Sequence, residues 1–248
     1  IGPAGGIGYF NNGGEVIGID EGIIFATGPI GNALGPNEDT ETSGELNSGG
    51  DGDLDRLASA DVSDAVGFEF DFVPLDSLVT FRYVFASEEY CEYAGSKFND
   101  VFGFFISGPG INGGFSDNGE NVALIPGTND YVSINSVNHL NNSEYYISNE
   151  LREDARACNK PFAGASFASL IEYDGFTRVL TATLRLEPCQ TYHLRLVVGD
   201  VSDNLFDSAV FLEAESFNIG GSATVVAETT IDPEAVLEDA AQFGHAVD

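Results

Sequence analysis

The chain has 248 residues, with 9 Lys and Arg against 40 Asp and Glu, which gives a formal net charge of −31. This charge excludes a nucleic-acid-binding protein, because phosphate binding needs a basic face. Hydrophobic residues make up 43% of the chain and 19 residues are Phe, which excludes a disordered acidic chain. Two compatible interpretations of the charge stay open: a folded protein in a salty medium, and a protein that binds divalent cations.

The regular elements predicted along the chain are mostly short strands. Residues 53–60 predict one or two helical turns, and residues 66–73 then alternate, with Phe68, Phe70 and Phe72 on one face and acids on the other. Further strands are predicted at 81–85, 179–186, 192–198 and 209–213. Long loops rich in Gly and Asp separate them. The sequence therefore predicts an all-β fold, a jelly-roll-like antiparallel β-sandwich with Phe side chains in its core.

The C-terminal segment predicts one more strand and a short helix. Residues 222–231 are rich in β-branched side chains, which favour a strand. Asp232 caps a predicted helix that Pro233 begins and Gly244 ends. We therefore expect two parts. These are a sandwich domain over residues 1–218 and a strand-plus-helix extension over residues 219–248 that connects subunits.

The start of the chain indicates a secreted protein, and its cysteines allow one disulfide bond. The chain begins at Ile1 and contains no Met, which predicts a polypeptide whose secretion signal has been removed. No run of 18 apolar residues occurs, so no membrane-spanning helix is predicted. Three cysteines allow one disulfide bond and leave one thiol, and all three pairings of Cys91, Cys158 and Cys189 stay open.

Three clusters of oxygen side chains are candidate Ca²⁺ ligands, because Ca²⁺ accepts six to eight oxygens in flexible geometry and few basic residues are available to pair with them. Asp51, Asp53 and Asp55 alternate in a Gly-rich loop, without the EF-hand pattern. The other two clusters are Glu88, Glu89, Asn99 and Asp100, and Asp200, Asp203 and Asp207. The simpler alternatives are a solvated acidic loop for the first cluster, an ordinary exposed loop for Glu88 and Glu89, and a turn stabilised by the side chains of Asn99 and Asp100.

We expect no enzymatic activity. Glu88 with Glu89, or Glu88 with Asp100, imitates the carboxylate pair of a glycosidase. Adjacent residues on a strand face opposite sides, however, so Glu88 and Glu89 cannot converge unless a loop bends them. His139, His193 and His245 are scattered, and none lies in a nucleophile or zinc motif.

A series of ordered blocks resembles a known family. The three most informative blocks are FASEEY at 85–90, KFNDVFGFFISGP at 97–109 and GDVSDNLFDSAVF at 199–211. Others lie at 6–10, 22–28, 50–54, 121–128, 132–135, 173–177, 188–193 and 215–217. Together they resemble the choice-of-anchor L domain of secreted bacterial surface proteins, typical of the Bacteroidota. The resemblance implies secretion and display at the cell surface, in adhesins or structural proteins.

Two departures from that family lead to a functional expectation. Family members usually carry strand-like sequence before the block at 6–10, and their sorting tail is replaced here by the strand at 222–231. A sandwich without its first strand has an open edge, which recruits a strand from another chain. We therefore expect a self-assembling extracellular filament or sheath subunit, joined to copies of itself by strand complementation and stabilised by Ca²⁺.

Two alternatives stay open: a fragment of a longer Ca²⁺-dependent surface adhesin, and a carbohydrate-binding module. In the second, sugars would stack on tyrosine rings, although the absence of Trp weakens this interpretation. The available tyrosines are Tyr90, Tyr93, Tyr131, Tyr145 and Tyr146. The expected partners are accordingly copies of the chain, other surface proteins and glycans.

Overall fold

The computed structural model describes residues 1–164 and 167–216. Its strands are β1 (Ile7–Phe10), β2 (Gly22–Ala26), β3 (Val62–Phe72), β4 (Leu78–Ser87), β5 (Val101–Ser107), β6 (Glu120–Asn121), β7 (Tyr146–Ser148), β8 (Gly175–Thr177), β9 (Leu180–Arg185), β10 (Tyr192–Val201) and β11 (Ser208–Glu213). The α-helices are α1 (Gly52–Ala58) and α2 (Arg152–Ala157). Short 3-10 turns are η1 (Ala4–Gly6), η2 (Ile30–Ala33), η3 (Ser116–Asn118) and η4 (Ser143–Tyr145).

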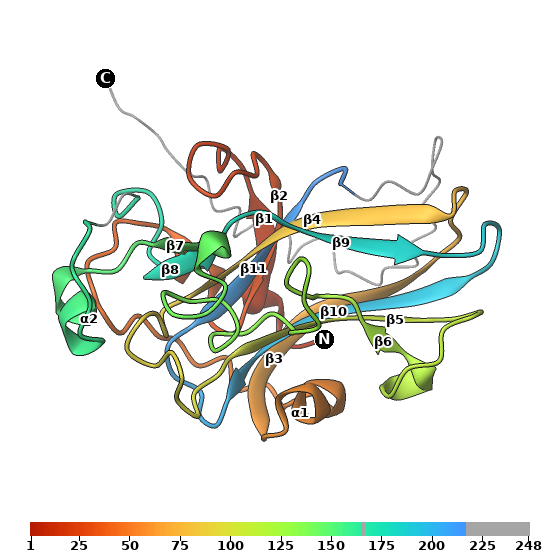
Figure 1. The fold of residues 1–248 in the computed structure, drawn as a ribbon, viewed down its shortest axis with the longest axis horizontal. Helices are drawn as coiled ribbons and strands as arrows, with labels where there is room; N and C mark the ends of the chain where they lie inside the picture. The colour runs from red at the N-terminus through yellow and green to blue at the C-terminus, as the bar shows by residue number, and fades with distance from the viewer. Residues whose placement is uncertain (165–166, 217–248) are drawn as a thin grey trace.

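The strands form two antiparallel sheets (Figure 1). The larger sheet has the order β1-β2-β11-β4-β8-β7. One further strand of this sheet, β9, also pairs with β4. The smaller sheet has the order β3-β10-β5-β6. The predicted all-β antiparallel sandwich is therefore confirmed.

A core rich in Phe fills the space between the sheets. Phe25 on β2, Phe104 on β5 and Leu196 on β10 are fully buried there. The rings of Phe81 and Phe104 meet edge to face with their centroids 4.8 Å apart, a favourable aromatic geometry. The expectation that Phe side chains form the core is confirmed for these residues.

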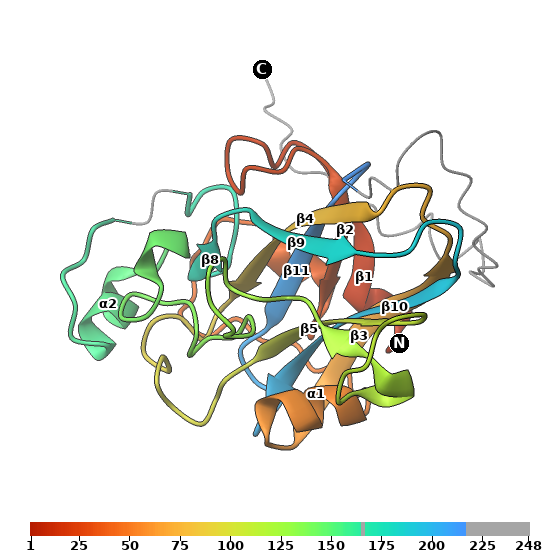
Figure 2. The same ribbon diagram turned by 45° about the vertical axis from the view of Figure 1, so that its right-hand side comes forward.

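Both sheets are also covered on their outer faces. Helix α1 lies against the smaller sheet (Figure 2), and its Leu54 is in one buried cluster with Phe105 and Val197 of that sheet. Loop residues Ile17 and Tyr173 cover the larger sheet. Because β5 is buried at every position, it shows no alternation of apolar and polar residues.

The element boundaries differ from the sequence-based expectations in three places. β3 begins at Val62 rather than Val66, because its first residues are mostly buried and do not alternate. Helix α2 was not predicted, since its six residues carry no apolar stripe. The predicted extension over 219–248, with its strand at 222–231, lies outside the described residues.

The structure selects one of the three disulfide pairings. Cys91 is bonded to Cys158, with their Cα atoms 5.8 Å apart, and Cys189 is a free, exposed thiol. The bond ties the loop after β4 to the end of α2. Across residues 1–164 and 167–216, none of the helices has the length and apolar character needed to cross a bilayer.

Candidate functional site

The first predicted Ca²⁺ cluster is paired with an arginine. Asp51 caps α1, and its Oδ1 accepts a hydrogen bond from Asp53 N at 3.0 Å. Arg195 on β10 donates to Asp53 Oδ2 at 2.7 Å and also to Asp51. Asp55 Oδ1 accepts from Val62 N at 2.8 Å. These carboxylates therefore have partners within the protein, and we place no cation beside them.

The other two predicted clusters come together at one end of the sandwich. Glu88 and Glu89 follow β4, Asp100 precedes β5, Asp200 lies in β10, and Asp207 precedes β11. The end of β4 pairs with the start of β11, and the end of β10 pairs with the start of β5. Antiparallel pairing thus gathers five carboxylates that the sequence presents in two groups, and all five are buried.

Several of these buried carboxylate oxygens have no hydrogen-bond partner among the described residues. Glu88 and Glu89 are both 0% exposed, and all their carboxylate oxygens are unpartnered. The same holds for Asp200 Oδ1 and for Oδ2 of Asp174, a buried residue just before β8. Burying an ionised carboxylate without a partner is strongly unfavourable unless it is neutralised. We therefore regard this group of acids as the candidate functional site.

The carboxyl groups of the site have raised pKa values. Burial, followed by repulsion from Asp100, raises the pKa of Glu89 to about 10. Burial and the carboxylate of Asp154 raise the pKa of Asp174 to about 10. The pKa of Glu88 also lies well above its ordinary value, because of burial and then the charge of Asp174. A bound divalent cation reverses this preference, because it favours the charged form of each carboxyl group.

Two members of the site are held in place by neutral donors. Asp100 Oδ1 accepts from Val201 N at 3.0 Å, and its Oδ2 accepts from Ser208 Oγ at 2.7 Å. Asp207 accepts from Gly44 N and Asn32 Nδ2, both at 2.8 Å. These donors fix the two side chains but bring no positive charge.

Sequence reasoning missed further residues of the site. Asn37 Nδ2 donates to Asp174 Oδ1 at 2.7 Å and to Asn149 O at 3.1 Å, while its own Oδ1 is buried without a partner. The carboxylate of Asp154 on α2 also belongs to these surroundings, because its charge contributes to the raised pKa of Asp174. The available sequence signal was two acids, Glu172 and Asp174, in the stretch 171–176, but the proximity of Asp174 to Glu88 depends on the pairing of β8 with β4.

Two predicted ligands occupy peripheral positions. Asn99 Oδ1 accepts from Asn135 N at 2.7 Å, and Asn99 lines an open polar pocket. Asp203 is half-buried and repels the carboxylates of Glu89 and Asp100. Within residues 1–164 and 167–216, no three acidic, His or Cys side chains are arranged to hold a metal ion as they stand. A Ca²⁺ ion would therefore also need amide, backbone or water oxygens, which it commonly uses.

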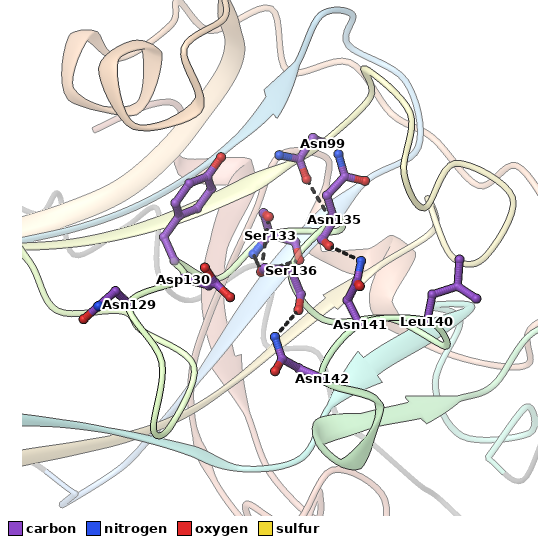
Figure 3. Close-up of a pocket in the computed structure, with 10 residues that line it drawn as sticks. Asn99, Asn129, Asp130, Ser133, Asn135, Ser136, Leu140, Asn141 and Asn142 are labelled. Carbon is purple, nitrogen blue, oxygen red and sulfur yellow. Dashed lines mark hydrogen bonds between the residues drawn. The ribbon is translucent and has the colours of Figure 1, made fainter.

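A second candidate site is an open polar pocket of about 700 Å³ beside Asn99 (Figure 3). Its lining consists of Asn99, Asn129, Asp130, Tyr131, Ser133, Asn135, Ser136, Leu140, Asn141 and Asn142. Asn141 Nδ2 donates to Asn135 O at 3.0 Å, and Asn142 Nδ2 donates to Ser136 O at 2.8 Å. The glycan-stacking prediction is wrong for Tyr90, which is fully buried, whereas Tyr131 lines this pocket.

A family model matches almost the whole of the described sandwich. The model of the choice-of-anchor L domain covers residues 2–218. The chain belongs to this family. Its choice-of-anchor L domain makes it a cell-surface or secreted protein, as the resemblance implied. No curated protein and no solved structure matches the chain.

The extent of the match places both candidate sites inside the choice-of-anchor L domain itself. Asn37 is the first residue of the acidic site in the sequence, and Asp207 is the last. Both lie well within the matched residues, as does the pocket beside Asn99. Membership of the family therefore indicates where the protein is located, and any inference about its binding chemistry depends on the geometry of these two sites.

Proposed function

We propose that this domain is an extracellular structural subunit that Ca²⁺ stabilises and that assembles with copies of itself into a surface filament or sheath. The observation that carries the Ca²⁺ part is the complete burial of Glu88 and Glu89 without partners, in a chain with 9 basic residues against 40 acidic ones. Carboxylate and amide oxygens suit Ca²⁺, and extracellular modules bind it with dissociation constants of about 10⁻⁴ to 10⁻³ M.

The edge of β3 supports assembly by strand complementation. β3 is the outermost strand of the smaller sheet, and Gly67 N on its outer side donates to Ile1 O at 3.1 Å. Further along that side, the backbone N–H groups of Glu69 and Asp71 have no backbone partner among the described residues. An open edge accepts an added strand, and the β-branched sequence at 222–231 is suited to provide one.

Imaging of the purified chain by negative-stain electron microscopy tests the assembly. We expect filaments in millimolar Ca²⁺ that dissociate in EGTA, and no filaments from a chain cut after residue 218. Circular dichroism checks that the shortened chain keeps its β structure. Filaments that form equally from the shortened chain would refute strand complementation. Monodisperse full-length particles in Ca²⁺ would refute assembly.

A second candidate function is glycan binding within a Ca²⁺-dependent adhesin, and the pocket beside Asn99 favours it. The amide and hydroxyl side chains that line the pocket can form hydrogen bonds with the hydroxyl groups of a sugar, and Tyr131 forms part of the pocket wall. A glycan array in millimolar Ca²⁺ tests this function, with Asn141→Ala as the pocket variant and Asn11→Ala as a matched control. Binding that is lost only in Asn141→Ala supports it, and no binding by the unaltered chain refutes it.

We propose no catalytic role for the acidic site. Glu88 and Glu89 are both fully buried. A glycosidase needs two carboxyl groups that flank one bond of the substrate. Product release from a panel of polysaccharides would contradict this assignment.

A further inference from the structure

A groove between the two sheets has walls of aromatic and aliphatic side chains. Phe68 and Phe70 of β3 line it from the smaller sheet. Ile23, Phe81 and Leu212 line it from the larger sheet. The volume of this apolar groove is about 200 Å³. Since an apolar cavity of about 150 Å³ binds a benzene ring and otherwise stays dry, the groove is large enough for one aromatic side chain.

The side chains that form the walls are partly accessible to solvent. Phe68 and Phe70 are half-buried, although Phe72 on the same strand is buried. The rings of Phe68 and Phe70 lie nearly parallel, with their centroids 6.2 Å apart. Ile23, on the other wall, is 40% exposed. An apolar side chain that enters the groove removes this surface from water, which is favourable.

The chain itself arrives at the apolar groove after β11. Residues 213–216 also line the groove, and Ser216 is the last residue before the part of the chain that is not described. Ser216 Oγ accepts a hydrogen bond from Arg82 N at 3.2 Å and donates one to Glu213 O at 2.9 Å. The next Cα atom lies only about 3.8 Å further along the chain. The following residue therefore starts at the wall of the groove.

That following residue is Phe217, which has the side chain that the groove fits. Among residues 217–248, only Phe217 and Phe243 carry a phenyl ring. Bringing a distant residue back to the groove costs more chain entropy than placing the adjacent one there, which favours Phe217. The match to the choice-of-anchor L domain covers residues 2–218, so Phe217 belongs to the matched domain.

We propose that the apolar groove is the binding site for the Phe217 side chain of the same chain. The ring completes the Phe-rich core at this side of the sandwich and fixes the point at which the C-terminal extension leaves the domain. That point lies beside β3, because Phe68 and Phe70 form one wall of the groove. This inference goes beyond the proposed function and does not depend on assembly or on Ca²⁺.

Thermal unfolding of the full chain in EGTA, at two protein concentrations, tests the proposal. We expect Phe217→Ala to lower Tm by roughly 6 to 20 °C, the loss for a buried Phe in a domain of this size. Phe243→Ala is the matched control, because it makes the same substitution further along the extension, and it should change Tm by less than about 2 °C. The loss should be the same at both concentrations, since the ring and the groove belong to one chain.

Benzene provides a second readout that a loss of stability elsewhere would not produce. Phe217→Ala leaves the groove empty, so saturating benzene should raise the Tm of this variant relative to the unaltered chain and to Phe243→Ala. Where Phe217→Ala does not fold, Phe217→Leu replaces it, with a smaller expected loss.

Three results would overturn the proposal: a Tm of the Phe217 variant equal to that of the unaltered chain, a loss in Phe243→Ala instead, and a loss that benzene does not reverse. A loss that depends on protein concentration would assign the ring to a second copy and would overturn it too. The chain cut after residue 218, used to test assembly, keeps Phe217, so the two proposals fail independently of each other.

Discussion

Replacing Arg195 by Met tests whether the Asp51 loop is held by an arginine or by a cation. Arg195 donates to Asp53 Oδ2 at 2.7 Å, and the Asp53 side chain is only 2% exposed. Breaking a buried ion pair costs about 3 to 5 kcal/mol, because the remaining charge stays buried. Asp53 keeps the hydrogen bond from Ser116 N at 2.9 Å and an ion pair with the exposed Arg56 at 3.7 Å, which places the loss near the lower limit. At 2 to 4 °C for each kcal/mol, about 3 kcal/mol lowers Tm by about 6 to 12 °C.

Urea unfolding followed by circular dichroism, in EGTA and in 10 mM CaCl₂, measures this loss. We expect the same loss in both solutions, since the partner of Asp53 is a side chain. Arg156→Met is the matched control, because the Arg156 side chain is 69% exposed and, among the described residues, pairs with the exposed Glu153. It should change the free energy of unfolding by less than about 0.5 kcal/mol. A loss for Arg195→Met that disappears in Ca²⁺ would refute the reasoning and make the loop a cation site.

Three further substitutions have expected outcomes in the same assay. Replacing both Cys91 and Cys158 by Ala should cost about 4 kcal/mol, because the bond closes a long loop with a sequence separation of 67, while Cys189→Ala serves as the neutral control. Glu88→Gln should be at least as stable as the unaltered chain in EGTA, yet gain about 1.4 to 2.7 kcal/mol less from 10 mM Ca²⁺. Phe102→Ala should cost about 3 to 5 kcal/mol, and a cost under 1 kcal/mol would contradict its core position.

The sequence predicted best the strands that have one face buried in the core and the other face exposed to solvent. The alternation over 66–73 predicted most of β3, because one face packs in the core and the other faces solvent. The start of β3 was not predicted, since Val62 packs against α1 as well as within the sheet. The six-residue α2 was missed for the opposite reason, because it buries too few side chains to show a period.

The candidate site was predicted in part, and strand pairing explains the remainder. Glu88 and Glu89 were found because they follow the strand predicted at 81–85, and Asp100 was found as part of the same cluster of oxygen side chains. Asp174 joins them only through the pairing of β8 with β4, which a single sequence does not specify. The Asp51 loop was interpreted as a cation site because its counter-ion, Arg195, lies 144 residues away along the chain.

The central claim is that Ca²⁺ stabilises this domain through its buried carboxylates, and thermal unfolding of the full chain in EGTA and in 10 mM CaCl₂ tests it most directly. With a dissociation constant of about 10⁻⁴ to 10⁻³ M, a bound ion contributes about 1.4 to 2.7 kcal/mol. It then raises Tm by roughly 3 to 11 °C. MgCl₂ at the same concentration should raise Tm less, because Mg²⁺ retains its water and demands stricter geometry. Unfolding curves that coincide in EGTA and in Ca²⁺ would contradict the claim.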